Sequence, residues 1–459
     1  MSIINNSAAC AHPDLDLFYT PPTNTSVEYG NWIEINPTTT TNNGVLEFHH
    51  PGSDNYIHLS ETDFYVKVKI YKLEGNDKKN LENTDIVAPI NNFMHSLFSQ
   101  VDVTIGNLTI ENSNKLYPYK AYISDLLNNN SEVKKTQMVS QFWYDDDANQ
   151  MDNLNIEATK YLPLESDMKD KLLSEYIQEN NVNSGFIKRR KALLDGKGVI
   201  EMIGKLNCDL FNTNRYLISN VPFNVKLTQN DSKFCLMHKK EQNFQIDILA
   251  AILIPRIARI SPSVKIAHLA ALEKYPIKYP IKRVVVKSNL IPSGVTASTI
   301  NFTTLASTPS RIIFGLVKQA GSTGNSEMNP FNFQNFELSS ISLDVGGQAR
   351  PFAKELDVDY KNNKFIRNYY SLSEQIKKPY PGHGITLEEY KGGKALYIWD
   401  LTPDLLGGEC FNLIHRENVA INVKFSEALS YPLSAITLLE FDNIIETDKD
   451  LQFSADYRI

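Results

Sequence analysis

Alternation of hydrophobic and polar residues with a period of two dominates the chain. In segment 64–73, Phe64, Val66, Val68 and Ile70 fall on one side of an extended chain, and lysines and tyrosines fall on the other. Similar alternation occurs in further segments, at 100–105, 223–227, 245–248, 340–345 and 421–425. Because Gly, Pro and Asn separate these short runs, the pattern predicts an all-β protein built from sandwiches or barrels.

Helical periodicity is rare in this sequence. Residues 119–127 predict a helix that packs Ala121, Ile123 and Leu126 or Leu127 against the fold. A second helix is predicted at 164–177, with Ser166 as a candidate cap. Its hydrophobic stripe has 3.6-residue spacing and consists of Leu164, Met168, Leu172, Leu173 and Ile177.

Short blocks of the first half recur, in the same order, in the second half. The matched blocks are 98–106 with 338–346, 221–227 with 419–425, and 250–254 with 435–439. The separation between partners shrinks along the chain, so the first half carries extra residues between its middle and late strands. The repeat predicts one β fold used twice in tandem.

The repeat and the composition together suggest a division of the chain. Residues 1–44 are rich in Pro, Thr and Asn and predict an extended N-terminal arm, with one candidate strand at 32–35. The remaining predicted units are a first β domain at 45–260 with a helical and loop insertion around 107–215, a linker at 261–278, and a second β domain at 279–459.

Composition and charge exclude several classes of protein. The chain has 459 residues, of which 42% are hydrophobic and 22% charged, a balance that argues against wholesale disorder. Its formal net charge of −7 argues against a general DNA-coating protein. The four cysteines, Cys10, Cys208, Cys235 and Cys410, are far apart in the sequence. This spacing favours neither a disulfide scaffold nor a zinc ribbon, and isolated thiols fit a reducing compartment. We expect neither a transmembrane segment nor a signal peptide.

Candidate chemistry is sparse. Nucleophile-elbow, zinc-protease, dinucleotide and P-loop motifs are missing from the sequence, so we expect no catalytic residues, no cofactor and no metal. His49, His50 and His58 lie close in sequence, but their spacing favours strand-end histidines over a metal site. Asp145-Asp-Asp147 is interpreted as a solvated loop because the spaced ligands of a calcium loop are lacking. Lys188-Arg-Arg-Lys191 could bind nucleic acid or direct nuclear import, and a solvated helix face or an inter-subunit patch fits it equally well.

Tyrosines flanked by proline form a further group, which includes Tyr275, Tyr279 and Tyr380. Aromatic side chains in such loops can anchor a neighbouring protein. They can equally cover the ends of their own sandwich.

A set of strings along the chain resembles a known family. Leu-Thr-Pro-Asp at 401–404 and Leu-Glu-Phe-Asp-Asn at 439–443 are the most specific of them. The others lie at 48–59, 65–70, 244–248, 255–257, 261–264, 332–347, 396–400, 411–413 and 418–425. Together, over residues 18–459, they resemble the major capsid proteins of Polinton/Maverick elements and of related adintoviruses.

The resemblance implies a fold and a function. The fold would be all-β, two tandem eight-stranded jelly rolls with a few short helices in insertions. The function would be that of a viral major capsid protein whose homotrimers form pseudo-hexagonal capsomers of an icosahedral shell. Expected partners are further copies of the chain, neighbouring capsomers and minor capsid or penton proteins, with no sequence-specific binding of nucleic acid. The protein would lie in the virion after assembly in the cytoplasm or nucleus of a host cell.

Three alternatives remain open. The first is an enzyme on paired jelly rolls, such as a glycan-releasing amidase or a cupin-type oxygenase. The second is a carbohydrate-binding or receptor-binding β-sandwich module, such as a vertex or spike protein. The third is a capsid gene retained in a host genome without forming particles.

Overall fold

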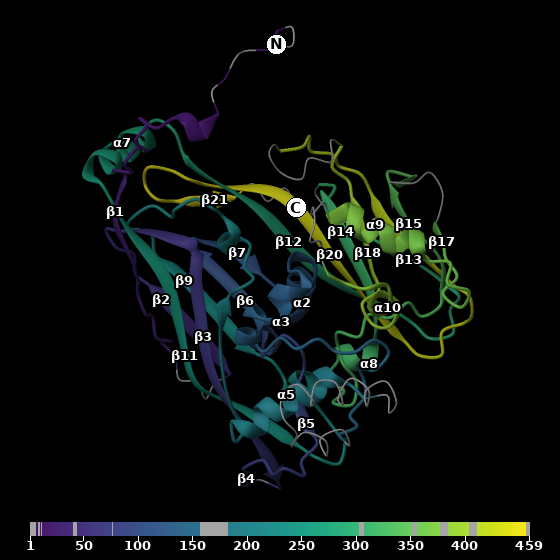
Figure 1. The fold of residues 1–459 in the computed structure, drawn as a ribbon. Helices are drawn as coiled ribbons and strands as arrows, with labels where there is room; N and C mark the ends of the chain where they lie inside the picture. Colours follow the sequence, from purple (N-terminus) through teal and green to yellow (C-terminus); the bar gives the residue numbers. More distant parts are fainter. Residues whose placement is uncertain are drawn as a thin grey trace.

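The computed structural model describes residues 6–7, 10, 12–39, 44–75, 77–156, 182–302, 307–350, 356–376, 384–403 and 411–455. Strands form two sandwiches that lie next to each other, one from each half of the chain (Figure 1). The helix predicted at 164–177 lies outside the described residues.

The first sandwich has two antiparallel sheets. One sheet runs in the order β1 (Val27–Trp32), β11 (Phe244–Ile260), β3 (Tyr56–Glu74) and β8 (Val199–Lys205), with the short β4 (Asp77–Lys79) extending the end of β3. The other runs in the order β2 (Val45–His50), β9 (Phe223–Gln229), β6 (Phe98–Ile105) and β7 (Leu108–Asn112). A separate pair consists of β5 (Val87–Pro89) and β10 (Leu236–His238).

The second sandwich repeats this arrangement. One sheet runs in the order β12 (Ile277–Ile291), β20 (Leu433–Thr447), β14 (Arg311–Lys318) and β18 (Leu396–Asp400), and β21 (Phe453–Ala455) pairs with β20. The other runs in the order β13 (Ala297–Asn301), β19 (Val419–Phe425), β15 (Leu338–Val345) and β16 (Gln348–Arg350), and β17 (Leu356–Asp357) pairs with β15.

The two halves therefore share one topology. When the short strands β4, β5, β10, β17 and β21 are left out and the remaining eight of each half are numbered in chain order, they lie as 1-8-3-6 in one sheet and 2-7-4-5 in the other, which is the order of an eight-stranded jelly roll. The sequence repeats fall on equivalent strands: β6 with β15, β9 with β19, and β11 with β20. The predicted fold class, two tandem jelly rolls, is confirmed.

Period-two alternation explains why each strand buries one side. Along β3, Phe64, Val66, Val68 and Ile70 are fully buried, while the residues between them are half-exposed. The ring of Phe64 meets Phe48 of β2 edge-on at 5.9 Å between centroids, so the two sheets of the first sandwich contact each other through these rings. Burial of such side chains is the main force that holds the sheets face to face.

Helices occupy the connections between strands. They are η1 (Pro13–Leu15), α1 (Phe93–Ser96), α2 (Tyr117–Asn128), α3 (Ser131–Lys135), η3 (Gln137–Gln141), α5 (Ser184–Asp195), η5 (Leu210–Asn212), α6 (Ser232–Cys235), α7 (Pro262–Leu272), α8 (Gln319–Ser322), α9 (Ile366–Ile376) and α10 (Leu387–Lys391). The helix predicted at 119–127 is confirmed as α2, which buries Ala121, Ile123, Leu126 and Leu127. Helix α7, between β11 and β12, was not predicted.

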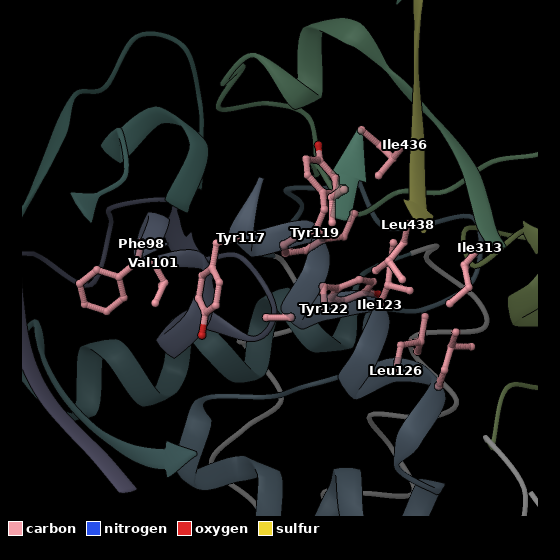
Figure 2. Packing of buried hydrophobic residues seen from close by; sticks show 14 of the residues in the cluster. Phe98, Val101, Tyr117, Tyr119, Tyr122, Ile123, Leu126, Ile313, Ile436 and Leu438 are labelled. Carbon is pink, nitrogen blue, oxygen red and sulfur yellow. The ribbon is translucent and has the colours of Figure 1, made fainter. Parts of the chain in front are cut away.

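One hydrophobic core spans both jelly rolls. Tyr119, Tyr122, Ile123 and Leu126 of α2 lie between residues of the first roll and the side chains of Ile313, Ile436 and Leu438 from the second roll (Figure 2). Helix α2 is therefore the hydrophobic connection between the two rolls.

Candidate assembly site

The two jelly rolls meet at a seam, which we define as α2, residues 143–152, residues 329–333 and Lys394. Aromatic rings fill its centre. The ring of Tyr122 stacks on Phe331 of the second roll at 4.1 Å between centroids, with 1° between the planes, and on Trp143 at 5.3 Å. Because these rings come from both halves and are fully buried, separating the rolls would expose a large apolar area.

A buried carboxylate joins the halves beside this stack. Asp146 accepts hydrogen bonds from Arg189 Nη2 at 2.6 Å and from Asn183 Nδ2 at 2.9 Å within the first half. It also accepts a 2.9 Å hydrogen bond from Asn329 Nδ2 of the second half. The side chains of Asp146 and Arg189 are fully buried, so each charge depends on these partners.

A second link across the seam centres on Lys394. Its ammonium group donates to Asp145 Oδ1 of the first roll at 3.0 Å and to Glu389 Oε1 at 2.7 Å. Burial disfavours the charged form of Lys394, but the Asp145 and Glu389 charges outweigh it and raise the pKa of the lysine. Burial alone would raise the pKa of Asp145, whereas Lys394 and Lys134 hold it below its ordinary value.

The interpretation of Asp145-Asp-Asp147 as a solvated loop is therefore wrong. Asp145 and Asp146 bond to the second half, and Asp147 Oδ2 accepts a 2.5 Å hydrogen bond from the backbone amide of Ser184, at the start of α5. The loop is a structural contact that positions one roll against the other.

The interpretations of the basic run on α5 are also corrected. Arg189 donates from Nε to the Pro89 carbonyl at 2.7 Å, and Arg190 donates from Nε to the Asp85 carbonyl at 2.9 Å. Both arginines are buried, and only Lys188 and Lys191 face solvent. The run is therefore neither a continuous nucleic-acid or import patch nor a solvated face, because its two central charges serve the fold.

A third buried network connects the base of α2 with β12. Lys120 donates to Glu111, and to Asp209 Oδ1 at 2.7 Å, while the amide of Val284 in the second roll donates to Asp209 Oδ2 at 3.0 Å. Burial raises the pKa of Glu111, and the positive charge of Lys120 offsets this only in part. The network ties the first strand of the second roll to the first roll.

An open cleft of about 960 Å³ runs along the boundary between the rolls. Among the residues lining it are carboxylates and cations of both halves, including Asp63, Asp125, Arg311 and Asp442. Burial raises the pKa of Asp63, Asp125 and Asp442. Within the described ranges, no three His, Cys, Asp or Glu side chains are grouped so that they could hold a metal ion.

The remaining residues singled out in the sequence are scattered. His49 is exposed and bonds Asn224, whereas His50 stacks on Phe223 and His58 packs on Tyr216. Cys208 and Cys235 are buried free thiols and Cys10 is exposed, while Cys410 lies outside the described residues. Tyr279 is buried and accepts a hydrogen bond from the Ile218 amide, Tyr275 is exposed, and Tyr380 lies outside the described residues.

Sequence patterns did not reveal the roles of the seam residues Asn329 and Lys394, nor that of Arg189, which bonds the seam residue Asp146. A signal for the arginines was present, because Arg189 and Arg190 lie three and four positions after Phe186 and therefore share its side of a helix. Phe186 is fully buried. For Asn329 and Lys394 no local pattern predicts a contact between the rolls, since their partners across the seam, Asp146 and Asp145, lie far away in sequence.

Large apolar side chains are exposed in several places on the single chain. They include Leu15, Leu17, Phe18 and Tyr19 of the N-terminal segment, Tyr29 and Trp32 of β1, Ile266 and Leu269 of α7, and Phe411, Leu413 and Ile414 near β19. Large contiguous apolar patches are typical of surfaces that a partner covers, so these segments are candidates for contacts with other chains. No helix within the described ranges is both long enough and apolar enough to cross a membrane.

Comparison of sequences finds one related protein and no family. No known family model matches the chain. An uncharacterized protein of Caenorhabditis elegans is 23% identical over 444 residues, which cover 93% of this chain and 97% of that protein.

Comparison of structures finds viral capsid proteins. A chain in the cryo-EM structure of the Sputnik virophage has a TM-score of 0.61 and 12% identity, over 98% of this chain and 93% of its own. The mavirus major capsid protein has a TM-score of 0.55 and 10% identity, over 99% and 96%. The Faustovirus major capsid protein has a TM-score of 0.53 and 9% identity, over 93% and 92%. This chain therefore has, over nearly its whole length, the double jelly-roll fold of viral major capsid proteins.

Proposed function

We propose that the protein is a viral major capsid protein, and that three copies form a pseudo-hexagonal capsomer of an icosahedral shell. The observation that carries the proposal is the repetition of one eight-stranded order in a single chain whose fold matches capsid proteins from end to end. The function lies in surfaces and not in a pocket.

Geometry explains why a doubled roll suits a shell. Three copies of a chain with two similar rolls place six similar units around a three-fold axis, so the outline becomes close to hexagonal. Hexagonal outlines tile the flat facets of an icosahedron. Each first roll would meet a neighbour's second roll in a closed, heterologous ring. The seam suits this role, because the Asp145–Lys394 ion pair, the Asp146–Asn329 hydrogen bond and the stacked rings hold the two rolls of each subunit against each other.

The division of the chain follows from this role. We propose an N-terminal arm at 1–44, a first jelly roll at 45–260 with its insertion around 107–215, a linker at 261–278 and a second jelly roll at 279–459. The later part of the arm contains β1, which pairs with β11, so this part of the arm serves as an anchor and also supplies the first strand of the first roll's eight-stranded order. The apolar side chains ahead of this anchor suit an arm that orders against neighbouring subunits or minor capsid proteins.

We infer the lineage of this capsid protein from the sequence strings at 401–404 and 439–443. Their resemblance supports membership of the Polinton/Maverick and adintovirus lineage. In that setting the protein would be made and assembled in the cytoplasm or nucleus of a host cell and would end in the virion, beside minor capsid and penton proteins.

Measuring the mass and shape of the purified protein tests the proposal. We expect a particle of three times 52.0 kDa, and negative-stain images with a hexagonal outline. A monodisperse monomer at micromolar concentration, with no such outline, would contradict the capsid function and favour a carbohydrate-binding or receptor-binding module.

A further inference from the structure

A groove beside α7 is an unfilled apolar site on the single chain. It has a volume of about 610 Å³ and lies between α7, the start of β1, the start of β12 and residues 214–218. Apolar walls come from Tyr56, Tyr216, Val264, Ala271, Tyr275 and Ile277. Its volume is within the roughly 300–1,000 Å³ of pockets that enclose a ligand the size of several side chains. We call it the α7 groove.

Helix α7 itself is poorly covered. Of its eleven residues only Leu272 is buried, although Val264, Ile266 and Leu269 are hydrophobic. Tyr275, which follows the helix and lines the groove, is 73% exposed. Because α7 buries so little of its hydrophobic surface against its own chain, the helix gains little stability there. A partner that covered these side chains would stabilise it.

The N-terminal segment of the same chain exposes large hydrophobic side chains that would fit an apolar groove. Residues 13–19, which we call the arm peptide, begin in the short helix η1 and expose Leu17 by 79% and Phe18 by 96%. Figure 1 shows this segment outside the two sandwiches, at the N-terminal end of the chain. The peptide therefore has no hydrophobic contact for its largest side chains in the single chain.

Charge makes the two surfaces complementary. The arm peptide carries Asp14 and Asp16 among its hydrophobic residues. The rim of the α7 groove carries Arg215 and Lys278, and Arg215 Nη1 donates to the Lys278 carbonyl at 2.5 Å, which holds the guanidinium at the rim. Lys278 Nζ also lies 3.4 Å from Glu446 Oε1, so Arg215 supplies most of the positive charge of this rim. An acidic, hydrophobic peptide and a hydrophobic groove with a basic rim match in sign, and such complementarity steers association and specifies register.

We propose that the α7 groove of one copy binds the arm peptide of a second copy. This inference rests on the proposed oligomeric capsid function and names its receptor surface. In a closed ring each chain supplies one arm and one groove, so every exposed peptide finds one site. Phe18 and Leu17 enter the groove, and Asp14 and Asp16 face the Arg215 and Lys278 rim.

Disulfide trapping between two different chains tests this proposal. In a background with Cys10 and Cys410 replaced by serine, chains with Phe18→Cys are co-assembled with chains carrying Ala271→Cys in the groove, and then oxidised. We expect a covalent dimer, because docking holds the two thiols at an effective concentration in the millimolar range. The matched control is Ala270→Cys, the neighbouring exposed alanine that does not line the groove. Its yield should be roughly ten-fold lower.

Charge reversal provides the second test. Asp14→Lys with Asp16→Lys should reduce the covalent yield several-fold, and Arg215→Glu with Lys278→Glu on the groove chain should restore it. Equal yields with Ala270→Cys would overturn docking in the groove. A further chain carries both Phe18→Cys and Ala271→Cys. If it formed its disulfide only within one chain and never between two chains, the exchange of arms would be overturned. The oligomer mass of the same sample separates the two proposals. Trimers without the disulfide contradict the groove alone, whereas monomers contradict both.

Discussion

At the scale of single residues, the seam depends on charges that are buried but paired. The side chains of Asp146 and Arg189 have no contact with solvent, so the charge of each loses its hydration and is balanced by the charge of the other. A buried pair adds little net stability compared with two hydrophobic residues, but removing one partner is expensive. The pair holds the Asp146 carboxylate in place to accept its hydrogen bond from Asn329 of the second roll, and in this way it helps to fix the orientation between the rolls.

Replacing Arg189 tests this reading. Arg189→Met leaves Asp146 buried and unpaired and also removes hydrogen bonds to the carbonyls of Pro89 and Tyr144. We expect the free energy of unfolding to fall by about 3–5 kcal/mol, measured by denaturant titration. Lys188→Met, on the exposed side of the same helix, should change it by less than about 0.5 kcal/mol. Equal effects of the two variants would contradict the structural role of Arg189.

The carboxyl group of Asp125, which lines the cleft between the rolls, should make the stability of the fold depend on pH. Burial raises its pKa from 3.8 to about 7, and the hydrogen bond from Asn92 and the charge of Lys134 oppose the shift only in part. The stability that this group contributes is fully present below pH 3.8 and is lost as the pH rises through about 7. His95, 3.7 Å from Asp125, has a pKa lowered by burial to about 4, so its contribution rises with pH in the same window and masks the effect in the wild type.

Comparison with Asp125→Asn isolates the carboxylate. Between pH 5 and 8, the stability of the variant relative to the wild type should improve by roughly 2–3 kcal/mol. Denaturant titrations at a series of pH values measure this difference. Asp77→Asn, on the exposed strand β4, should follow the wild type throughout. A difference between Asp125→Asn and the wild type that does not change with pH would refute the shifted pKa.

At the scale of elements, α2 is a main hydrophobic connection between the two rolls, beside the polar links from the loop at 143–152. Tyr122→Ala would leave a cavity among Phe331, Phe333 and Trp143, so we expect a loss of about 3–5 kcal/mol in the free energy of unfolding. Tyr370→Ala on the exposed face of α9 is the matched control and should have little effect. If denaturant titration gave the two variants the same stability, α2 would not be the hydrophobic connection between the rolls.

Elements also show what the sequence could and could not reveal. The strand β3 and the helix α2 were predictable because their patterns are local, with a period of two in one and an apolar side in the other. The repeat predicted equivalent strands because each copy must bury the same positions. The role of Asp146 was not predictable, because its partner Asn329 lies in the other half and a carboxylate in a loop looks the same whether water or an amide binds it. Helix α7 was missed because prolines around it suggest a linker.

At the scale of the whole molecule, we propose that the chain is one subunit of a larger closed assembly. The seam holds the two rolls against each other, and several large apolar side chains stay exposed on the single chain, where further copies would cover them. Doubling of the roll then turns three-fold symmetry into a nearly hexagonal shape.

The mass of the purified protein in solution tests this claim most directly. Mass photometry or sedimentation velocity should give a single species of three times 52.0 kDa, and negative-stain images of that species should show six-lobed particles. The measurement needs no partner protein and no nucleic acid. A single species of 52.0 kDa that persists at micromolar concentration would contradict the account.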